Sequence, residues 1–249
     1  DMENDISAAS ELHQKYKHFR ILVIGRANAG KTTLLKRVCN TTEEPCIYDK
    51  QNNNLVHLDL PYQRGIHDVN RPFAFKSNPQ FIFHDSPGFE AGGVEELNKV
   101  QQFIEEHAKA TEANDQLHVI WFCFRPDKSR PLLDLERQFF NKHVKNVPVI
   151  AIYTKFDDLV SQVYDPELEV EMATEENRQC AIFCLKDKFE KPLDKCEFPP
   201  KAHLHLEGMY CFKELIQKTA DSLDNFAIEM LFVSVQQNNL ELCIKYAVR

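Results

Sequence analysis

An apolar run, a short loop bounded by two glycines and a helix-forming run follow one another near the start of this chain. The apolar run covers residues 19–24, the loop is Gly25-Arg-Ala-Asn-Ala-Gly-Lys-Thr32, and residues 33–39 favour a helix. A strand and a helix joined by G-x-x-x-x-G-K-T predict a phosphate-binding loop (P-loop), because the loop N–H groups and the helix N-terminus point at one anion. No other feature constrains the fold as much, because a P-loop requires a strand before it and a helix after it.

Within this loop the candidate phosphate contacts are Asn28, Ala29, Gly30, Lys31, Thr32 and Thr33. Gly25 and Gly30 allow the backbone to turn sharply and approach an anion. Lys31 is expected to reach the β- and γ-phosphates, and the Thr32 hydroxyl is expected to bind Mg²⁺. The alternative, a glycine-rich turn without a ligand, is disfavoured by the flanking strand and helix.

The composition indicates one large domain. The chain has 249 residues, of which 43% are apolar, and 30 basic against 38 acidic side chains give a net charge of −8. No basic block stands out, which disfavours nucleic acid as the primary ligand. Scattered cysteines without a signal peptide predict reduced thiols and a cytoplasmic location. Because the chain starts at Asp1 and ends inside an expected helix, we expect a piece of a longer protein, with membrane contact only through flanking segments.

Buried strands that alternate with helices predict a largely parallel α/β sheet covered on both faces. The expected strands are 19–25, 72–76, 80–84, 117–124, 147–153 and 227–233, and the expected helices are 30–39, 94–110, one from 131 onward with Ser129 as its N-cap, and 239–248. The polar stretch 41–71 is too long for an ordinary connection and is expected to be functional or mobile. Residues 1–17 are expected to form an N-terminal arm before a single domain at 18–249.

Residues 158–225 do not fit a minimal unit of this kind. They favour a helix at 166–191, a Pro- and His-rich turn at 198–205 and a helix at 208–225, so we expect a helical insertion ahead of the last strand. Several metal-binding residue types gather here: Cys180, Cys184, Cys196, His203, His205 and Cys211. Their spacing matches no standard zinc module, which favours buried thiols and surface histidines over a zinc site.

A second motif, D-x-x-G, follows the expected strand at 80–84. Asp85, at the carboxyl end of that strand, is placed to hold Mg²⁺ through water. The Gly88 N–H can contact a γ-phosphate and order the loop that follows. The candidate switch II residues are Ser86, Pro87, Gly88 and Phe89. Alone, the motif also fits a plain turn, but its position directly after a buried strand favours the nucleotide role.

A third motif, T-K-x-D, follows the expected strand at 147–153 as Thr154-Lys-Phe-Asp157. The Asp157 carboxylate can accept hydrogen bonds from the guanine N1–H and exocyclic amine, which adenine cannot supply. The Lys155 stem can pack over the plane of the base. The alternative, a charged turn at a strand end, is disfavoured by the order of the three motifs.

Together the three motifs resemble the TRAFAC class of P-loop GTP-binding domains, or G domains, over about 18–157 and 227–249. Segments such as Asn28-Ala-Gly-Lys-Thr and Phe83-His-Asp-Ser-Pro-Gly-Phe are also similar to uncharacterised fungal G-domain proteins. The resemblance implies a three-layer fold with a six-stranded sheet in the order 2-3-1-4-5-6, strand 2 being antiparallel. It also implies GTP or GDP with Mg²⁺ as ligands, and a further base contact at Ser234 and Val235.

Two residues depart from the Ras-like pattern. Phe89 stands where Ras-like proteins carry the glutamine that positions water, which excludes their route to hydrolysis; alternatively, Phe89 simply packs on the following helix. Asn28 stands where potassium-dependent members of the class carry a K⁺ ligand, although it could instead close the loop by a local hydrogen bond. The resemblance therefore implies a hydrophobic-substituted subclass with Asn28, Lys31 and Thr32 as catalytic residues, K⁺ as a cofactor and a nucleotide-dependent homodimer through the switches.

The candidate switch I lacks the threonine that the family normally offers to Mg²⁺ and the γ-phosphate. Its candidate residues are Gly65, Ile66, His67 and Asp68, where Ile66 occupies the expected place and His67 or Asp68 would substitute. We therefore predict a Mg²⁺-dependent GTPase switch whose hydrolysis is slow, or stimulated by K⁺ or a partner, with an unidentified effector. The alternatives are a non-hydrolysing module gated by GTP or GDP (a pseudo-GTPase) and a general P-loop ATPase.

Overall fold

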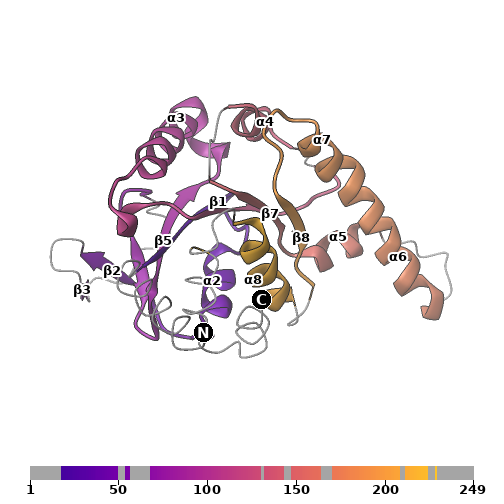
Figure 1. The fold of residues 1–249 in the computed structure, drawn as a ribbon. Coiled ribbons are helices and arrows are strands. Elements are labelled where there is room, and N and C mark those ends of the chain that lie inside the picture. Colours follow the sequence, from indigo (N-terminus) through magenta and orange to yellow (C-terminus); the bar gives the residue numbers. More distant parts are fainter. Residues whose placement is uncertain are drawn as a thin grey trace, which may run out of the picture.

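The computed structural model describes residues 18–49, 54–56, 68–129, 132–142, 147–163, 170–207, 211–223 and 228. Within these ranges an eight-stranded sheet runs in the order β3-β2-β4-β5-β1-β6-β7-β8 through the centre of the molecule (Figure 1). The strands are β1 (Phe19–Gly25), β2 (Cys46–Asp49), β3 (Asn54–Val56), β4 (Phe73–Phe75), β5 (Asn78–Pro87), β6 (Val119–Phe124), β7 (Val149–Tyr153) and β8 (Ala202–His205).

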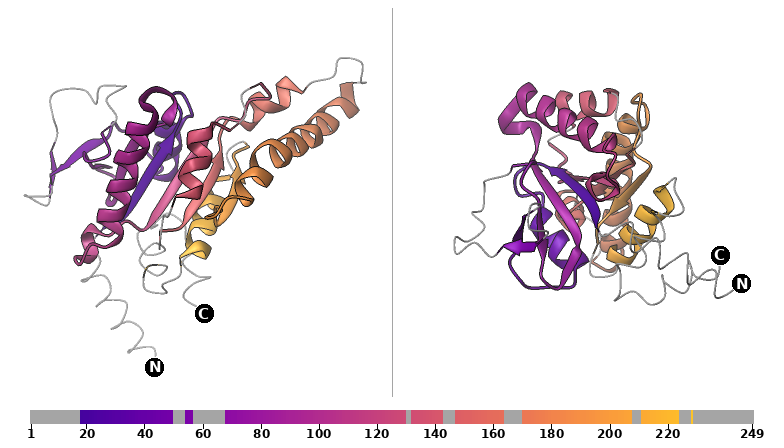
Figure 2. Two further views of the ribbon diagram at one scale, coloured as in Figure 1. Left: turned by 90° about the horizontal axis from the view of Figure 1, so that it is seen from above. Right: turned by 60° about the vertical axis from the view of Figure 1, so that its left-hand side comes forward.

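Helices cover both faces of this sheet (Figures 1 and 2). They are α2 (Lys31–Val38), α3 (Phe89–Ala108), α4 (Asp134–Asn141), α5 (Phe156–Gln162), α6 (Val170–Leu185), α7 (Lys191–Asp194) and α8 (Cys211–Ser222), with the 3₁₀ turn η1 (Ala113–Asp115) and the π-helical turn η2 (Lys186–Glu190). Because alternate strand residues face opposite sides, Ile21 and Val23 of β1 pack with α2 and α8, whereas Leu22 and Ile24 pack with α3 and α4. The result is the expected three-layer α/β fold.

The strand order confirms the predicted topology. β5, β1, β6, β7 and β8 pair in parallel, and β4 pairs antiparallel with β5. The series β4-β5-β1-β6-β7-β8 is therefore the expected order 2-3-1-4-5-6. The expected count of six strands was too low, because β2 and β3 extend the antiparallel edge from within 41–71. These two strands are too short, and too mixed with polar residues, for periodicity to show them.

Among the described residues, the strand that pairs with β7 on the side away from β6 is formed by a segment that the sequence predicted to be a turn. The segment 198–205 was expected to be a turn, but Ala202–His205 forms β8, parallel to β7. Helices α5 to α7, which belong to the predicted helical insertion, therefore connect β7 with the neighbouring strand β8. The sequence signal failed because Pro199 and Pro200 precede the strand and only Leu204 within it is deeply buried.

Some predicted boundaries also differ. The predicted N-cap Ser129 is wrong: its N–H donates to Asp127 Oδ1 at 2.7 Å, and α4 begins only at Asp134. Helix α3 starts at Phe89 rather than 94, but Gly93 interrupts it with a φ of 55°, so its regular part begins where predicted. The predicted arm at 1–17, the strand at 227–233 (apart from residue 228) and the helix at 239–248 lie outside the described residues.

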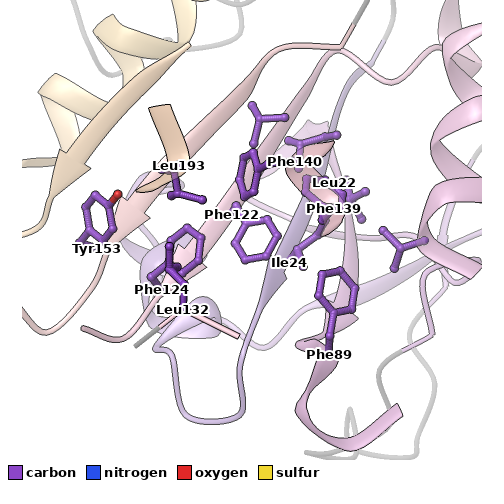
Figure 3. Close-up of a cluster of buried hydrophobic side chains, with 14 of the residues drawn as sticks. Leu22, Ile24, Phe89, Phe122, Phe124, Leu132, Phe139, Phe140, Tyr153 and Leu193 are labelled. Carbon is purple, nitrogen blue, oxygen red and sulfur yellow. The ribbon is translucent and has the colours of Figure 1, made fainter. Parts of the chain in front are cut away.

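A cluster of aromatic rings fills the space between the sheet and α4 (Figure 3). Phe122 and Phe124 of β6 stack with their centroids 4.6 Å apart, and Phe139 of α4 packs 5.2 Å from Phe122. On the other face Trp121 is fully buried, as predicted, and donates its Nε1–H to Thr219 Oγ1 of α8. None of the described helices is long and apolar enough to cross a bilayer.

Candidate nucleotide-binding site

The three sequence motifs lie at one edge of the sheet, where the carboxyl ends of its parallel strands meet. The P-loop follows β1, D-x-x-G ends β5, and T-K-x-D follows β7. The parallel register sets Gly25 of β1 directly opposite Pro87 of β5 and Cys123 of β6. In open α/β sheets this edge is the usual place for a ligand.

Two glycines give the P-loop its shape. A side chain at Gly25 would bring its Cβ within 2.6 Å of the Cys123 carbonyl oxygen, so only glycine allows β1 and β6 to approach this closely. Gly30 has a φ of 73° and forms the N-cap of α2, with no atom within 4 Å of the place its Cβ would occupy. Asn28 is exposed and has a φ of 60°, a left-handed conformation that asparagine tolerates better than most residues. Two residues of the loop, Asn28 and Gly30, therefore have a left-handed backbone conformation.

Lys31 and Asp85 come together at the base of this loop. The Lys31 ammonium donates to the Gly25 carbonyl oxygen at 2.7 Å and lies 3.7 Å from Asp85 Oδ1. Lys31 is only 7% exposed and Asp85 5%. This position lets the lysine turn from the Gly25 carbonyl toward a phosphate bound in the loop, where the charge of the anion would hold it more strongly.

The residues expected to hold Mg²⁺ fit that ion chemically. Thr32 lies exposed in the first turn of α2, and Asp85 ends β5 beside Lys31. Hydroxyl and carboxylate oxygens are the hard ligands that Mg²⁺ prefers, together with water and the oxygens of a bound phosphate.

The start of the candidate switch II rests directly on the P-loop. A Cβ at Gly88 would lie 2.6 Å from both the N and the Cα of Arg26, so glycine is required for this contact. The buried Ser86 hydroxyl donates to Glu96 Oε1 of α3 at 3.2 Å. Phe89 is 1% exposed and points into the aromatic cluster, with Phe122 and Phe139 each 6.0 Å away (Figure 3). Phe89 is therefore a packing residue, as the alternative interpretation held, and it packs on β6 and α4.

A buried ion pair fastens the P-loop to α4. Arg26 Nε and Nη2 donate to the two carboxylate oxygens of Glu136, each at 2.8 Å. The Glu136 side chain also accepts the Leu133 N–H at 2.9 Å and so caps the helix. Burial tends to lower the pKa of the Arg26 guanidinium, but the hydrogen bonds and charge of Glu136 outweigh it and raise the pKa overall. The sequence analysis assigned no role to Arg26, because no local pattern shows a partner so far along the chain.

The candidate switch I is described only at its end. Gly65, Ile66 and His67 lie outside the described residues. Asp68 closes a local turn: its Oδ1 accepts the Asn70 N–H and its carbonyl oxygen accepts the Arg71 N–H, both at 3.0 Å.

His84 fastens Val69, directly after the candidate switch I, to the strand that carries Asp85. Its Nδ1 donates to the Val69 carbonyl oxygen at 2.8 Å, and its Nε2 accepts from Arg20 Nη1 at 3.1 Å. A carbonyl can only accept and a guanidinium can only donate, so these contacts fix the neutral tautomer. Burial lowers the pKa of His84 to about 3, and the charge of Arg20 adds to this effect. No local pattern in the sequence predicts this contact.

The T-K-x-D motif borders a pocket of about 480 Å³. The pocket is lined by Gly30, Thr33, Leu34, Arg37, Thr154, Lys155, Asp157, Leu206 and Phe212. Thr154 has a structural role, because its hydroxyl donates to the Phe124 carbonyl oxygen at 3.1 Å and fixes the end of β7. Lys155 begins α5 with a φ of 53° and Asp157 lies in its first turn, both exposed, while Phe156 between them is buried.

The loop after β8 also reaches this pocket. Leu206 donates its N–H to the Tyr153 carbonyl oxygen at 2.8 Å and lines the pocket wall. The resemblance placed a base contact at Ser234 and Val235, which lie outside the described residues.

The motifs are matched by one family model, described as 50S ribosome-binding GTPase, over residues 20–155. The chain belongs to this family. The matched range contains the P-loop and D-x-x-G and ends within T-K-x-D, at Lys155. A 50S ribosome-binding GTPase has a P-loop G domain that binds GTP and GDP, and such GTPases typically use Mg²⁺. No curated protein matches the sequence.

The cysteines and histidines of the predicted insertion have other contacts. Cys180 is exposed on α6, and Cys196 Sγ lies 3.5 Å from the Pro192 carbonyl oxygen. His203 lies between the Tyr153 hydroxyl (2.8 Å) and Asp194 Oδ1 (2.9 Å). Among the described side chains, no three His, Cys, Asp or Glu residues come close enough to share a metal ion. The side chain of Cys211 is not among them.

Proposed function

We propose that this G domain is a cytoplasmic guanine-nucleotide switch that hydrolyses GTP slowly with Mg²⁺, and that K⁺ or a partner accelerates the reaction. The observation that carries the proposal is the meeting of Lys31 and Asp85, 3.7 Å apart, at the same sheet edge as the pocket beside Asp157. Lys31 binds the β- and γ-phosphates, while Lys155 and Asp157 bind the guanine base.

Thr32 and Asp85 hold the metal in this proposal. When bound, Mg²⁺ neutralises charge on the β- and γ-phosphate oxygens. The Gly88 N–H then contacts the γ-phosphate of GTP, and the loss of that contact after hydrolysis releases the segment that follows. Because Gly88 touches the Arg26 backbone, this release is transmitted at the P-loop itself.

Phe89 and Asn28 together favour K⁺ as the accelerating ion. The Phe89 ring is buried in the core, so it cannot orient an attacking water. Asn28 is exposed in the P-loop, and its side chain makes no hydrogen bond to any described residue, which disfavours the alternative of local loop closure. A K⁺ ion held by the Asn28 oxygen would stabilise the charge that develops on the phosphates.

Single-turnover GTP hydrolysis in K⁺ and in Na⁺ tests this role. Asn28→Gly removes the amide but keeps a residue that accepts the left-handed backbone, and Asn40→Gly is the matched control because Asn40 is also exposed, with a φ of 47°. We expect turnover about tenfold faster in K⁺ than in Na⁺. A tenfold difference in rate corresponds to about 1.4 kcal/mol of activation free energy. Asn28→Gly should abolish the difference and Asn40→Gly should not. Equal rates in both salts would contradict the K⁺ role.

The non-hydrolysing alternative is favoured by one observation, the absence of a threonine from Gly65–Asp68. In that case the domain binds GTP and GDP, and the bound nucleotide controls the binding of a partner without GTP hydrolysis. The same single-turnover experiment separates the two functions, since tight GTP binding without phosphate release in either salt would select the pseudo-GTPase.

We also propose that two copies of the chain pair through the switch regions when GTP is bound. The support is the family resemblance together with the close approach of Gly88 to the Arg26 backbone, which joins the candidate switch II to the P-loop. Light scattering with GDP and with a non-hydrolysable GTP analogue tests it. A mass that doubles only with the analogue supports pairing, and an unchanged mass contradicts it.

A further inference from the structure

The pocket beside T-K-x-D is also lined by residues that no sequence motif supplies. T-K-x-D supplies part of the lining, and Arg37 of α2 and Phe212 of α8 line the same pocket. We propose that Phe212, held in place by Arg37, stacks on the nucleobase opposite the Lys155 stem and supplies base-independent affinity. This inference rests on the proposed function, because it requires a purine nucleotide in the pocket.

Phe212 is supported from behind but is not enclosed. Its ring packs against the core between the sheet and α8 and remains partly accessible. The Arg37 guanidinium carbon lies 5.5 Å from the centre of the ring, within the range of a cation–π contact. Arg37 itself is exposed, so its charge costs little to hold there. These contacts fix the ring at the pocket wall.

Phe212 is also the only aromatic residue among the described residues that line this pocket. A purine has two π faces, and the Lys155 stem can cover only one of them. Stacking on an aromatic ring accepts any base, whereas hydrogen bonds to Asp157 read the guanine edge. Phe212 is therefore expected to raise the affinity for GTP, GDP and ATP alike, while Asp157 sets the ratio between them.

Two substitutions at this position test the stacking. Phe212→Leu keeps an apolar side chain against the core but removes the ring, and we expect it to weaken GDP and GTP binding about 10- to 100-fold without changing the GTP-to-ATP ratio. Phe212→Trp retains the ring, and its affinity should stay within a few-fold of wild type. Both are measured by isothermal titration on the full chain, with thermal melts to check folding.

The tryptophan variant gives an independent spectroscopic signal. The chain has one native tryptophan, the buried Trp121, so indole at position 212 reports on the pocket. We expect GDP to quench the fluorescence of Phe212→Trp by stacking. Glu214→Trp is the matched control, because Glu214 is exposed on the same helix and does not line the pocket. It should not respond.

The outcomes separate this inference from the proposed function. If wild type binds GTP tightly while Phe212→Leu binds within twofold of it, or if GDP leaves Phe212→Trp fluorescence unchanged, the stacking role is overturned and the GTP-binding function stands. If wild type binds no guanine nucleotide, both fail together. If Phe212→Leu does not fold, quenching of Phe212→Trp but not of Glu214→Trp supports the role, and equal responses overturn it.

Discussion

The phosphate end and the base end of the nucleotide site are built differently. At the phosphate end, Lys31 and Asp85 are buried and paired, and Gly88 rests on the backbone of Arg26. At the base end, Lys155 and Asp157 are exposed beside an open pocket. Groups that help to pack the fold cannot be changed without affecting stability, whereas exposed groups can. We therefore expect substitutions at the phosphate end to affect folding and binding, and those at the base end to affect binding alone.

The largest effect is expected at the ion pair beneath the P-loop. Glu136→Ala leaves the Arg26 guanidinium buried without its carboxylate, and breaking a buried pair in this way costs about 3–5 kcal/mol. Urea unfolding monitored by circular dichroism measures the loss.

An exposed ion pair of similar geometry is the control for this experiment. Arg178 and Glu207 approach to 2.8 Å, as Arg26 and Glu136 do, but both lie near the surface. Since exposed pairs contribute little, Glu207→Ala should change stability far less than Glu136→Ala. If both variants lost the same free energy of unfolding, burial would not make the ion pair at the phosphate end more important for stability than an exposed pair.

The next effect concerns Lys31. Lys31→Ala removes the only charged group of the P-loop placed to reach the phosphates, so we expect GTP and GDP affinity each to fall about 100-fold or more, on the scale of lost charge-assisted hydrogen bonds. Lys36→Ala removes the same charge from a more exposed position on α2 and should change affinity less than about threefold. Similar losses in both variants would mean that overall charge, not the loop, binds the phosphates.

A smaller, pH-dependent effect is expected far from the nucleotide. His118 is buried against Phe19, and its Nδ1 accepts the Arg20 N–H at 2.9 Å. Burial, aided by the charge of Arg20, lowers the pKa of His118 from 6.5 to about 4. The unfolded state therefore takes up a proton first, and stability is lost as the pH falls from 6.5 to 4, by at most about 1.4 kcal/mol per pH unit.

His118→Phe should remove this component, because a phenyl ring can stack on Phe19 but cannot titrate. Unfolding free energies measured from pH 7 to pH 4 give the slope of stability against pH. The hydrogen bond that the variant loses lowers all these values equally, so it does not change the slope. Identical slopes in the variant and wild type would contradict the assignment. Nucleotide affinity at pH 7 should be unchanged, which separates this buried site from the phosphate end.

The sequence predicted the parts of the site that depend on local pattern. Each of the three motifs joins a buried strand to a turn, so hydrophobic runs and glycine positions suffice to bring Lys31, Asp85 and Asp157 to one edge. The strand order followed from the family resemblance. By contrast, β8 has four residues, and His203 within it is held by its contacts with Tyr153 and Asp194, which no short window of sequence contains.

Contacts between distant residues were also missed. Arg26 with Glu136, His84 with Val69, and Phe212 with Arg37 each join separate elements. A charged or aromatic residue in a helix has no periodicity that reveals its partner. The sequence therefore locates the chemistry of the phosphate end, and the structure is needed for the contacts that hold it and for the other residues that line the base pocket.

The central claim is that this P-loop serves a guanine nucleotide, and titrations of wild type and Asp157→Asn with GTP, ATP and xanthosine triphosphate test it most directly. An asparagine amide cannot accept both guanine protons but can donate to the carbonyl that xanthine carries in place of the amine. We predict that wild type prefers GTP over ATP, and that Asp157→Asn loses GTP affinity, gains affinity for xanthosine triphosphate and keeps its thermal stability. Equal GTP and ATP binding in wild type, unchanged in Asp157→Asn, would contradict the claim and indicate a general P-loop ATPase.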